Sequence, residues 1–441
     1  MKKNDAAQAL LKKFADKSAR VGIVGLGYVG LPLALEFVRA GFHVVGVDVS
    51  TEKVARIGRG KSYIEDIPDA ELRAANKTGR LSVSTDYKSL RKVSSVSITV
   101  PTPLGKSREP DVSYIQEAVS ELGKVLPRGA LVVLESTTYP GTTRELVEAH
   151  LIEAGYTVDK DVFVAFSPER VDPGNKQWKT YNTPKVVGGT TPTGTKLAAA
   201  LYQQAVETVV SVGSTEEAEM VKLLENTFRA VNIALVNELM LMCDRMGIDI
   251  WNVINAASTK PFGFMPFFPG PGIGGHCIPL DPTYLAWRAK AYNYTNRFIE
   301  LATDINGNMP RFVLNKSARI LNHEEKKALN GSKILLLGMA YKPGVSDVRE
   351  SPGVEVYRLL TAEGAKVAYT DPNVPVINEP SIGKKLTSQK ITPAMLKGYD
   401  LVVMITNHAE FDCKEIARHA QLVLDTRNAF GAITKKNIHR L

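Results

Sequence analysis

Long hydrophobic runs are missing from this chain of 441 residues. Nowhere do eighteen apolar residues follow one another, and no apolar segment follows the charged start MKKND. Crossing a bilayer takes about 20 consecutive apolar residues, and a secretory signal needs an apolar segment near the start. The sequence therefore predicts neither a transmembrane helix nor a signal peptide, and we expect a cytoplasmic protein without a membrane partner.

Cysteine is scarce, with three residues, Cys243, Cys277 and Cys413. They cannot all pair with one another, and they fall in segments whose patterns predict a helix, a loop and a helix. Disulfide-stapled domains and zinc clusters depend on several closely spaced cysteines. The sequence therefore excludes both classes, and we expect no metal site.

Clustered charge of one sign is confined to the two ends. The formal net charge is +9, but residues 1–20 carry six Lys and Arg against two Asp, and residues 435–441 add three more basic groups. The rest of the chain is close to neutral, whereas nucleic-acid-binding proteins present a basic face. We expect no nucleic-acid partner, and a local basic pocket for an anionic small molecule stays open.

What is present is the strand and helix alternation of an α/β protein. Residues 1–18 place Leu10, Leu11 and Phe14 at helical spacing among lysines, which predicts a short leader helix. From residue 19 on, buried-strand patterns alternate with helix patterns, as in a parallel doubly wound sheet. The strand patterns are RVGIVGLG, HVVGVDV, SVSITVP, ALVVLEST and DVFVAF.

Residues 214–330 have a different texture. They open with some thirty residues without Pro or internal Gly, which predicts one long, mostly buried helix. Residues 331–441 then restore the strand and helix alternation. Because 441 residues exceed what one hydrophobic core supports, we predict an α/β protein with doubly wound domains at 19–213 and 331–441, joined by a long central helix.

The pattern GxGxxG occurs at Gly25, Gly27 and Gly30, between a predicted strand and a predicted helix. In a βαβ unit the glycines permit a tight turn, close approach to a pyrophosphate, and packing of helix on strand. Asp48 ends the next strand, where a carboxylate accepts hydrogen bonds from a ribose and repels a 2′-phosphate. The motif predicts a dinucleotide site that prefers NAD to NADP.

Three polar residues of the long helix, Glu219, Lys222 and Asn226, are spaced three and four apart and therefore share one stripe. Such stripes are common on solvated helices, where Glu and Lys form salt bridges. Apolar neighbours at Met220 and Leu223 leave little room for a fully exposed face. Both a structural and a functional interpretation stay open at this point.

The segment GPGIGGHCIPLDP, residues 270–282, places Cys277 after a glycine-rich run and before Asp281. A buried structural thiol is the commonest fate of a cysteine. Gly274 and Gly275, however, would let the backbone approach a substrate closely, and Asp281 lies near enough in sequence to position or deprotonate a reacting group. The spacing favours a covalent oxidation site at Cys277.

Taken together, the motifs resemble the UDP-glucose/GDP-mannose dehydrogenase family over nearly the whole chain. The resemblance implies two Rossmann-like domains, the first binding NAD and the second the nucleotide sugar, with a central helix that forms a homodimer or higher homo-oligomer. The matching blocks are GLGYVG, VPTP (Val100–Pro103), ESTTYPGT (Glu135–Thr142), FSPER (Phe166–Arg170), EMVKLLENTFRAVNIALVNE (Glu219–Glu238), GGHCIPLDP and YKPGVSDVRESP (Tyr341–Pro352).

The resemblance also implies a reaction, the four-electron oxidation of a sugar C6 alcohol to a carboxylate with two NAD. Cys277 would form a thiohemiacetal with the intermediate aldehyde and then a thioester. Lys222 and Asn226 would stabilise the developing oxyanion, a task suited to a cation and an amide donor. A cation such as Lys222 near the thiol would also favour the reactive thiolate.

Further roles follow from the same resemblance. Asp281 would orient water or act as a base in the first oxidation, Thr137 would hold a water, and Glu169 would be the base for thioester hydrolysis. The residues implied to contact the cofactor are Gly25, Gly27, Tyr28, Val29, Gly30, Asp48, Lys53, Thr102 and Arg349, and those implied to contact the substrate are Gly274, Gly275 and Lys342.

The substrate prediction depends on departures from the UDP-glucose pattern. This chain has Pro173 where many UDP-glucose enzymes have a second glutamate, and Leu280 where they usually have lysine. The strings SPERVDPGN and PFGFMPFFPGPGIGGHCIPLDP resemble the subgroup that oxidises UDP-N-acetylhexosamines. UDP-N-acetylglucosamine is the first expectation, ahead of UDP-N-acetylgalactosamine, UDP-N-acetylmannosamine and UDP-glucose, and surface polysaccharide synthesis is the pathway the family suggests.

Two other classes of function remain as alternatives. A two-electron hydroxyacid dehydrogenase of the 6-phosphogluconate type would use Lys222 and Asn226, but it would leave Cys277 and the second α/β domain without a task. A non-catalytic nucleotide-sugar sensor would retain the fold but has no need of competent side chains at every proposed catalytic position. The number of NADH formed per sugar separates these alternatives.

Overall fold

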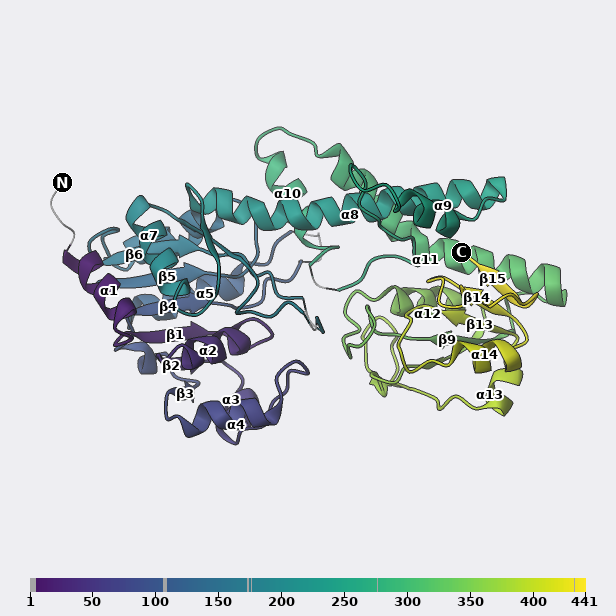
Figure 1. The fold of residues 1–441 in the computed structure, drawn as a ribbon, viewed down its shortest axis with the longest axis horizontal. Helices are drawn as coiled ribbons and strands as arrows, with labels where there is room; N and C mark the ends of the chain where they lie inside the picture. The colour runs from purple at the N-terminus through teal and green to yellow at the C-terminus, as the bar shows by residue number, and fades with distance from the viewer. Residues whose placement is uncertain (1–4, 106–108, 173, 176, 276, 432) are drawn as a thin grey trace. The chain divides into compact units, whose positions relative to one another are not determined.

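A computed structural model of the chain describes residues 5–105, 109–172, 174–175, 177–275, 277–431 and 433–441. The chain divides into two compact units (Figure 1). The N-terminal unit comprises Met1–Glu225 and Thr283–Tyr292, and the C-terminal unit comprises Asn226–Pro282 and Asn293–Leu441. The predicted domain boundaries at 18/19, 213/214 and 330/331 were drawn where the sequence pattern changes, whereas the two units are separated by their internal contacts. The predicted boundaries therefore stay a prediction.

The described part of the N-terminal unit is built on an eight-stranded sheet in the order β3-β2-β1-β4-β5-β6-β7-β8. The strand patterns predicted from the sequence correspond to β1, β2, β4, β5 and β6. The strands are β1 (Arg20–Val24), β2 (His43–Val47), β3 (Leu81–Ser84), β4 (Ser95–Ile98), β5 (Ala130–Leu134), β6 (Val162–Phe166), β7 (Lys185–Gly189) and β8 (Val209–Ser211).

Helices between these strands complete the doubly wound pattern. The segment TTRELVEAHLIE, predicted as one helix, begins with a π-helical stretch, η2 (Thr143–Glu148), and continues as α6 (Ala149–Glu153). The others are α2 (Gly30–Arg39), α3 (Thr51–Gly58), α4 (Asp69–Lys77), the short 3-10 helix η1 (Tyr87–Leu90), α5 (Ser113–Gly123) and α7 (Pro192–Tyr202).

One junction departs from the parallel sheet that the alternation predicts. Strand β7 pairs with β6 in antiparallel fashion, with Ala165 opposite Gly189 and Phe166 opposite Gly188. A parallel neighbour would require a crossover connection of a dozen or more residues, usually helical, but residues 167–184 return directly without a described helix. The start of β7, at Lys185, therefore lies at the same edge of the sheet as the ends of β5 and β6.

The leader helix α1 (Asp5–Ala15) packs onto the body of the N-terminal unit. Ala7, Leu10 and Phe14, three and four residues apart, are buried in the main hydrophobic cluster of this unit. The spacing places them on one face, as the periodicity predicted. Its lysines lie on the remaining faces, where their charges stay in water.

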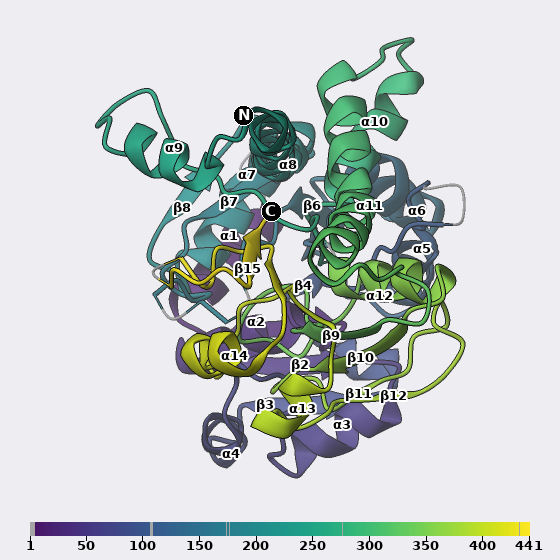
Figure 2. The same ribbon diagram turned by 90° about the vertical axis from the view of Figure 1, so that its right-hand side faces the viewer.

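The long central helix is α8 (Thr215–Met246), which contributes residues to both units and is seen along its length in Figure 1 and nearly end-on in Figure 2. The expectation that it is mostly buried is wrong. Val236, Met240 and Cys243 enter the core of the C-terminal unit, but a second set of apolar residues is exposed in the single chain. That set comprises Met220, Leu224, Phe228, Leu235, Leu239, Met242 and Met246.

The described C-terminal unit holds a five-stranded sheet, β10-β9-β13-β14-β15, whose neighbouring strands are all parallel. The strands are β9 (Lys333–Leu337), β10 (Lys366–Thr370), β13 (Leu401–Met404), β14 (Val423–Asp425) and β15 (Ile438–Arg440), with a hairpin of β11 (Val376–Ile377) and β12 (Leu386–Thr387) beside them. The helices are α9 (Ile250–Ala257), α11 (Arg297–Glu325), α12 (Pro352–Ala362), α13 (Pro393–Lys397) and α14 (Cys413–His419), and α10 (Asp281–Lys290) is shared between the units.

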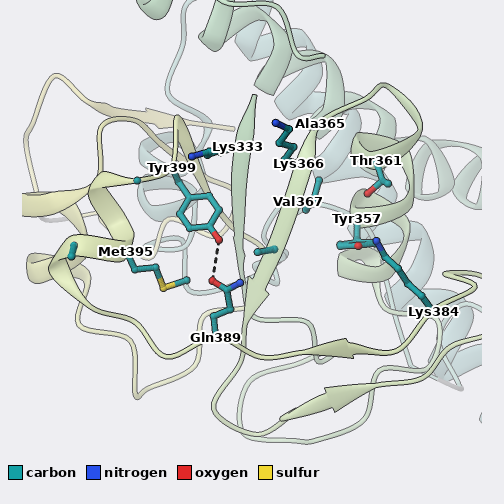
Figure 3. A pocket seen from close by; sticks show the side chains of 13 residues that line it. Lys333, Tyr357, Thr361, Ala365, Lys366, Val367, Lys384, Gln389, Met395 and Tyr399 are labelled. Atoms are coloured by element: carbon teal, nitrogen blue, oxygen red, sulfur yellow. Dashed lines mark hydrogen bonds between the residues drawn. The ribbon is translucent and has the colours of Figure 1, made fainter. Parts of the chain in front are cut away.

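A cavity of about 650 Å³ opens in the C-terminal unit beside the starts of β9 and β10, at Lys333 and Lys366 (Figure 3). Its walls include Tyr357 and Tyr399, and the hydroxyl of Tyr399 donates to Gln389 Oε1 at 3.0 Å. In open α/β sheets, ligands bind at the opposite, carboxyl ends of the strands. The cavity is therefore not where a doubly wound fold places its ligand.

Among the described residues no helix combines the length and the apolar character needed to span a membrane.

Candidate active site

The GxGxxG loop of the N-terminal unit has the geometry of a dinucleotide corner. Gly25 adopts φ +90°, which favours glycine. A side chain at Gly30 would place its Cβ 1.9 Å from the carbonyl oxygen of Gly25, so helix and strand pack too closely for any other residue. At Gly27 an added Cβ would meet no described atom within 4 Å. The second glycine therefore leaves open space in front of the backbone, where a pyrophosphate would approach.

Asp48 supports this loop from the end of β2. Its Oδ2 accepts a hydrogen bond from the backbone N–H of Leu26 at 2.8 Å, and its Oδ1 accepts from Ser50 N–H at 2.9 Å. Lys53 reaches Oδ2 at 3.4 Å. A carboxylate offers about four acceptor positions, so three donors still leave a position for a ribose hydroxyl.

The residues present at this corner fit an NAD site. The loop lies at the carboxyl ends of β1 and β2, the N-terminus of α2 follows it, and an anion is favoured there. Tyr28 is partly exposed beside the loop, and Val29 is the N-cap residue of α2. Lys53 lies in the first turn of α3. The chemistry of this donor set suits a pyrophosphate and a ribose that carries free hydroxyls.

Thr102 and Thr137 come together at the same edge of the sheet. The hydroxyl of Thr102 donates to the backbone carbonyl of Thr137 at 2.7 Å. The hydroxyl of Tyr284, on α10, donates to the carbonyl of Thr102. The loops after β4 and β5 are thus joined to each other and to α10 within the N-terminal unit.

Glu169 follows β6 in the same unit and lies against α8. Lys222 Nζ donates to its backbone carbonyl, and its Oε1 accepts from the backbone N–H of Val171. Burial raises the pKa of the Glu169 carboxyl, and the cation of Lys185 is the largest influence that lowers it. The negative charge of Glu135 raises this pKa, and Lys222 lowers it. A carboxylate with a raised pKa is a stronger base than an ordinary carboxylate, which suits it to accept a proton.

Glu219, the third member of the predicted stripe on α8, has a structural task. Its Oε2 accepts from Gly141 N–H at 2.6 Å, and its Oε1 accepts from the N–H and hydroxyl of Thr143 at 2.8 and 2.7 Å. It therefore caps the start of η2. Burial raises the pKa of Glu219 to about 7, although these hydrogen bonds oppose the shift.

Cys277, Asp281 and Asn226 are joined in the C-terminal unit. The carbonyl of Cys277 accepts from the backbone N–H of Asp281 at 2.8 Å, so the cysteine turn leads directly into α10. Asn226 donates through Nδ2 to Asp281 Oδ2 at 2.5 Å. Asp281 and Asn226 are buried, whereas Cys277 is partly exposed. Two predicted catalytic side chains are thus in direct contact, and the third begins the same turn.

Gly274 and Gly275 serve packing within their own unit. A Cβ at Gly274 would lie 2.7 Å from Cβ of Tyr341, and one at Gly275 would lie 2.9 Å from the Tyr341 ring. The N–H of Gly275 donates to the carbonyl of Arg349 at 3.1 Å. The sequence predicted that these glycines let the backbone approach a substrate closely. In the structure they let the backbone approach the 341–350 loop, and their contact with a substrate stays a prediction.

The 341–350 loop also carries Lys342 and Arg349, the residues predicted to meet the diphosphate and the cofactor. The guanidinium of Arg349 pairs with Asp347 at 2.6 Å and its side chain is half exposed. Lys342 is partly exposed in the same loop. Leu280, part of the substrate prediction, lies in the cysteine turn with its N–H donating to Cys277 O at 3.1 Å, and Pro173 lies outside the described residues.

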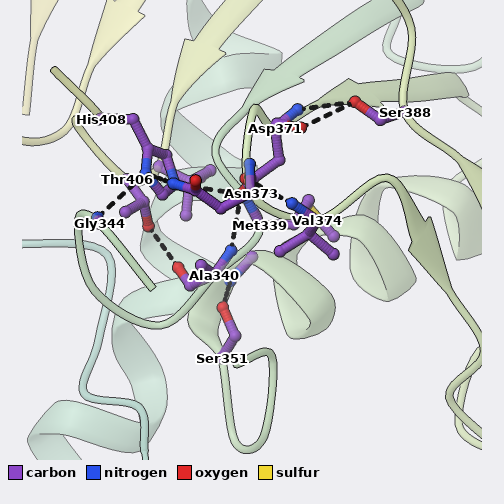
Figure 4. Close-up of polar contacts among 12 residues, drawn as sticks. Met339, Ala340, Gly344, Ser351, Asp371, Asn373, Val374, Ser388, Thr406 and His408 are labelled. Atoms are coloured by element: carbon purple, nitrogen blue, oxygen red, sulfur yellow. Dashed lines mark hydrogen bonds and ion pairs between the residues drawn. The ribbon is translucent and has the colours of Figure 1, made fainter. Parts of the chain in front are cut away.

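The C-terminal unit repeats the corner of the N-terminal unit with one addition (Figure 4). Asp371, at the end of β10, accepts from the N–H groups of Met339 and Ala340 at 2.6 and 2.9 Å, as Asp48 accepts from Leu26. The buried ring of His408 lies 3.1 Å from Asp371 Oδ2 and accepts from Gly344 N–H at 3.2 Å. The Asp371 carboxylate, which corresponds to Asp48, the carboxylate predicted to face a ribose, therefore contacts the imidazole of His408. The same imidazole holds the 341–350 loop through Gly344.

Three buried charged or titratable residues, His408, Lys185 and Glu135, are not singled out by any sequence motif. His408 lies in TNHAEF with no motif around it, and Lys185 is one charge at the start of the apolar run KVVGG. Glu135 is the first residue of ESTTYPGT, and nothing within that block distinguishes it. The signal that points to Lys185 and Glu135 is a charged residue directly at the beginning or the end of a buried-strand pattern.

The chain matches the same family of known proteins that its motifs resemble. Models of the UDP-glucose/GDP-mannose dehydrogenase family match in order along the chain. The NAD binding domain matches residues 19–206, the central domain residues 216–308 and the UDP binding domain residues 335–432.

Individual relatives are similar over most of their length. A UDP-N-acetyl-D-glucosamine 6-dehydrogenase from Pseudomonas aeruginosa is 35% identical over 90% of this chain and 92% of its own. A UDP-N-acetyl-D-mannosamine dehydrogenase from Methanococcus maripaludis is 34% identical over 93% and 92%. The solved structure of a UDP-D-ManNAc dehydrogenase from Pyrococcus horikoshii superposes with a TM-score of 0.86 at 31% identity, covering 96% of this chain and 98% of that one.

Proposed function

Because this chain belongs to the UDP-glucose/GDP-mannose dehydrogenase family, we propose that it oxidises the C6 hydroxyl of a UDP-N-acetylhexosamine to a carboxylate through a covalent adduct on Cys277. The coarser part of this function follows from membership itself. The chain is an NAD-dependent oxidoreductase of nucleotide sugars, with an NAD-binding domain and a UDP-binding domain. The sugar and the mechanism are the proposal.

The first proposal concerns the cofactor contacts. When bound, NAD accepts the hydride removed from C6 in each of the two oxidations. The backbone of Gly25, Gly27 and Gly30 would hold the pyrophosphate, and Asp48 would accept the ribose hydroxyls. Tyr28, Val29, Lys53 and Thr102 in the N-terminal unit, and Arg349 in the C-terminal unit, are the further contacts we propose.

The observation that carries the proposed mechanism is the turn that begins at Cys277 and leads into α10. Two-electron oxidation of an alcohol requires no thiol, whereas oxidation of an aldehyde to a carboxylate benefits from one. The thiolate adds to the aldehyde carbon, a C–S bond forms, and the carbonyl oxygen becomes an oxyanion that is protonated to a thiohemiacetal. The adduct cannot diffuse away between oxidations, and its oxidation leaves a thioester.

We propose that Asp281 and Asn226 serve the first oxidation and the oxyanion. Asp281 would take the proton of the C6 hydroxyl, directly or through water. Its contact with Asn226 at 2.5 Å orients the carboxylate. Asn226 and Lys222, four residues apart on α8, supply an amide donor and a cation for the negative oxygen.

Thioester hydrolysis is assigned to the N-terminal unit, where Glu169 would act as base. Its carboxylate takes a proton from water, the hydroxide adds to the thioester carbonyl, the C–S bond breaks, and the cysteine leaves as a thiolate. Thr137 would help to hold that water. The raised pKa of Glu169, caused mainly by burial, supports this assignment.

The substrate we propose is UDP-N-acetylglucosamine, with the galactosamine and mannosamine isomers next and UDP-glucose last. Leu280 in place of a lysine supports an acetamido sugar, because it removes a charge from the cysteine turn. Lys342 would meet the diphosphate, and Gly274 and Gly275 would lie close to the sugar. Relatives that act on UDP-N-acetyl-D-glucosamine and UDP-N-acetyl-D-mannosamine are similar to the same degree, so identity does not choose between them.

The test is the number of NADH formed per UDP-N-acetylglucosamine consumed. Two per sugar is expected. One per sugar would overturn the four-electron mechanism in favour of simple alcohol oxidation, and no turnover with any of the four sugars would point to a sensor. Comparing kcat/KM for the four UDP-sugars then identifies the substrate, and a preference for UDP-glucose would overturn the acetamido assignment.

The covalent role is tested by Cys277→Ser against Cys413→Ser, a matched variant of another partly exposed cysteine. Cys277→Ser should lose turnover by more than about a thousandfold, since removal of a nucleophile typically costs at least that much, and should still bind NAD. Cys413→Ser should keep its activity. Full activity in Cys277→Ser would show that the thiol is not the nucleophile.

A further inference from the structure

A buried ion pair lies at the sheet edge beside Glu169 and has no task in the reaction proposed above. Lys185 Nζ, at the start of β7, contacts Glu135 Oε2, after β5, at 2.6 Å. The Lys185 side chain is 8% exposed and that of Glu135 is 0% exposed. Burying two charges costs more than an apolar pair of the same size would, and such pairs are often neutral or unfavourable for stability. Stability alone is thus a weak reason for this pair.

The second oxygen of Glu135 is also held. The Tyr202 hydroxyl, on α7, donates to Glu135 Oε1 and lies 3.1 Å from the hydroxyl of Ser97, on β4. Both carboxylate oxygens therefore have a partner, and both Tyr202 and Ser97 are fully buried. The arrangement fixes the position of the negative charge, and with it the position of the Lys185 ammonium.

The loop that carries Glu169 is hydrogen-bonded to the residues that flank this pair. Ser167 donates through its hydroxyl to Val186 O at 2.7 Å, and Arg170 Nη1 donates to Pro184 O at 2.7 Å. These two carbonyls lie on either side of Lys185. The N–H of Ser167 donates to Leu134 O at 3.0 Å, next to Glu135. Glu169 is therefore held at a set position relative to both charges by bonds on either side of it.

Three ionisable groups act on Glu169 from the elements around it, Lys185 from β7, Glu135 from the end of β5 and Lys222 from α8. Tyr202, from α7, faces the same carboxylates: burial, Glu135 and Glu169 all raise its pKa. Burial raises the pKa of Glu169, and among the charges Lys185 acts on it most strongly, in the opposite direction. Lys222 is used by the proposed reaction at the oxyanion. Lys185 is left as the cation whose effect on Glu169 does not change during turnover.

We propose that Lys185 is a positioning residue whose charge keeps Glu169 in the ionised form that accepts a proton from water, and that Glu135 is the positioning residue that holds Lys185 in place. The pair acts through Glu169 and needs no contact with the substrate. Lys185 favours the carboxylate by direct attraction, and Glu135 both holds Lys185 in place and limits that attraction. This inference rests on the proposed role of Glu169 in thioester hydrolysis.

The pair can be broken from either side, and electrostatics predicts opposite results. Lys185→Gln removes the cation, so protonation of Glu169 becomes easier. The acid limb of the pH profile, where the rate of adduct hydrolysis falls as Glu169 is protonated, should then move to higher pH by about one unit. Glu135→Gln removes the anion and leaves Lys185 charged, so the limb should move to lower pH. A purely structural ion pair would give shifts of the same sign or none from both variants, because both break the same contact.

The measurement is the decay of the covalent adduct on Cys277 in a single turnover with UDP-N-acetylglucosamine and NAD. Samples quenched between pH 5 and 9 are read by intact-protein mass spectrometry, so oxidation and hydrolysis are followed apart. Lys185→Arg should restore the wild-type profile. Lys196→Gln, an exposed lysine on α7, should leave the limb unmoved. Shifts of the same sign from the two halves of the pair would overturn the proposal.

Two further variants keep the test decisive. If either single variant does not fold because a buried charge is unpaired, the double variant Glu135→Gln with Lys185→Gln carries no such charge. Its limb should move to higher pH, because the influence of Lys185 exceeds that of Glu135, and an unmoved limb would overturn the proposal. Glu169→Gln should accumulate the adduct. Rapid hydrolysis in Glu169→Gln would instead contradict the proposed function itself.

Discussion

At the scale of the residue, we propose that Asp48 determines which cofactor is accepted. Its carboxylate is nearly fully buried and already accepts the N–H of Leu26, so its position does not depend on a ligand. A negative charge fixed at this place attracts ribose hydroxyls and repels a 2′-phosphate. Lys53 at 3.4 Å is too exposed to neutralise this charge fully.

Replacing this charge should weaken the choice between cofactors. In Asp48→Asn the shape and one acceptor remain, but the charge is lost. A hydrogen bond to a charged group contributes about 1.5–3 kcal/mol, so the ratio of kcat/KM for NAD to that for NADP should fall roughly 10- to 100-fold. Asp86→Asn, at the exposed cap of η1, should leave the ratio unchanged. An unchanged ratio in Asp48→Asn would contradict the assignment of Asp48.

At the scale of elements, α8 carries different tasks along its length. Its first turns bind η2 through Glu219, its next turn places Lys222 on the Glu169 loop, and Asn226 lies one turn further on. The predicted stripe is therefore neither a solvated salt-bridge row nor a purely chemical set. It joins the helix to the loops that carry the predicted bases.

The contact of Glu219 with η2 should depend on pH. Because the folded pKa, about 7, lies above the usual 4.5, the folded state holds its proton more tightly than the unfolded state. The stabilisation is complete below pH 4.5 and is lost as pH rises through 7. The loss is on the order of 3 kcal/mol. In urea denaturation, the stability of wild type relative to Glu219→Gln should therefore fall between pH 5 and 8.

The matched control for this measurement is Glu217→Gln, an exposed carboxylate in the first turn of the same helix. Its stability difference from wild type should be the same at both pH values. If Glu219→Gln also gave a constant difference, then Glu219 would be ionised throughout this range and burial would not govern its protonation.

At the scale of the whole molecule, α8 presents an exposed apolar stripe. Leu235, Leu239, Met242 and Met246 are between 37% and 61% exposed and recur at intervals of four, three and four residues on one face of the helix. Exposed apolar patches of this kind mark protein interfaces. We expect this face to form the contact of a homodimer, as the family resemblance also implies.

Breaking this face should dissociate the assembly. Leu235→Glu with Met242→Glu places two charges in the expected interface, and light scattering should show the monomer mass of 48.1 kDa where the wild type shows at least twice that mass. Val210→Glu changes an exposed apolar residue on β8 and should leave the mass unchanged. A wild-type protein that is monomeric at micromolar concentration would remove the basis for this expectation.

Much of the fold could be read from periodicity. The pattern RVGIVGLG is rich in apolar residues because a parallel strand covered on both faces must be apolar throughout, and it forms β1. The antiparallel β7 could not be read in this way, because strand direction depends on how residues 167–184 return. The exposure of α8 could not be read either, because a helix that is apolar on two faces shows the same sequence pattern whether or not its own chain covers both faces.

The candidate site divides in the same way. The GxGxxG loop, Asp48 and Cys277 are local signals, since each depends on chain neighbours that the sequence displays. Glu135 and Lys185 are 50 residues apart, and His408 and Asp371 are 37 apart. Pairs at such separations carry no spacing rule, so periodicity and motifs could not find them.

The sequence by itself determined the order of elements, the glycine loop and the cysteine turn, because these depend on local backbone geometry and on side chains a few residues apart. Tertiary structure decided which charges face one another. The antiparallel return of β7 brings Lys185 to the edge where β5 and β6 end, and folding buries the pair, which strengthens its field because nearby water no longer screens it. The proposed base, Glu169, lies in a motif that the sequence displays, whereas the charged pair that we propose to govern it became visible only in the folded sheet.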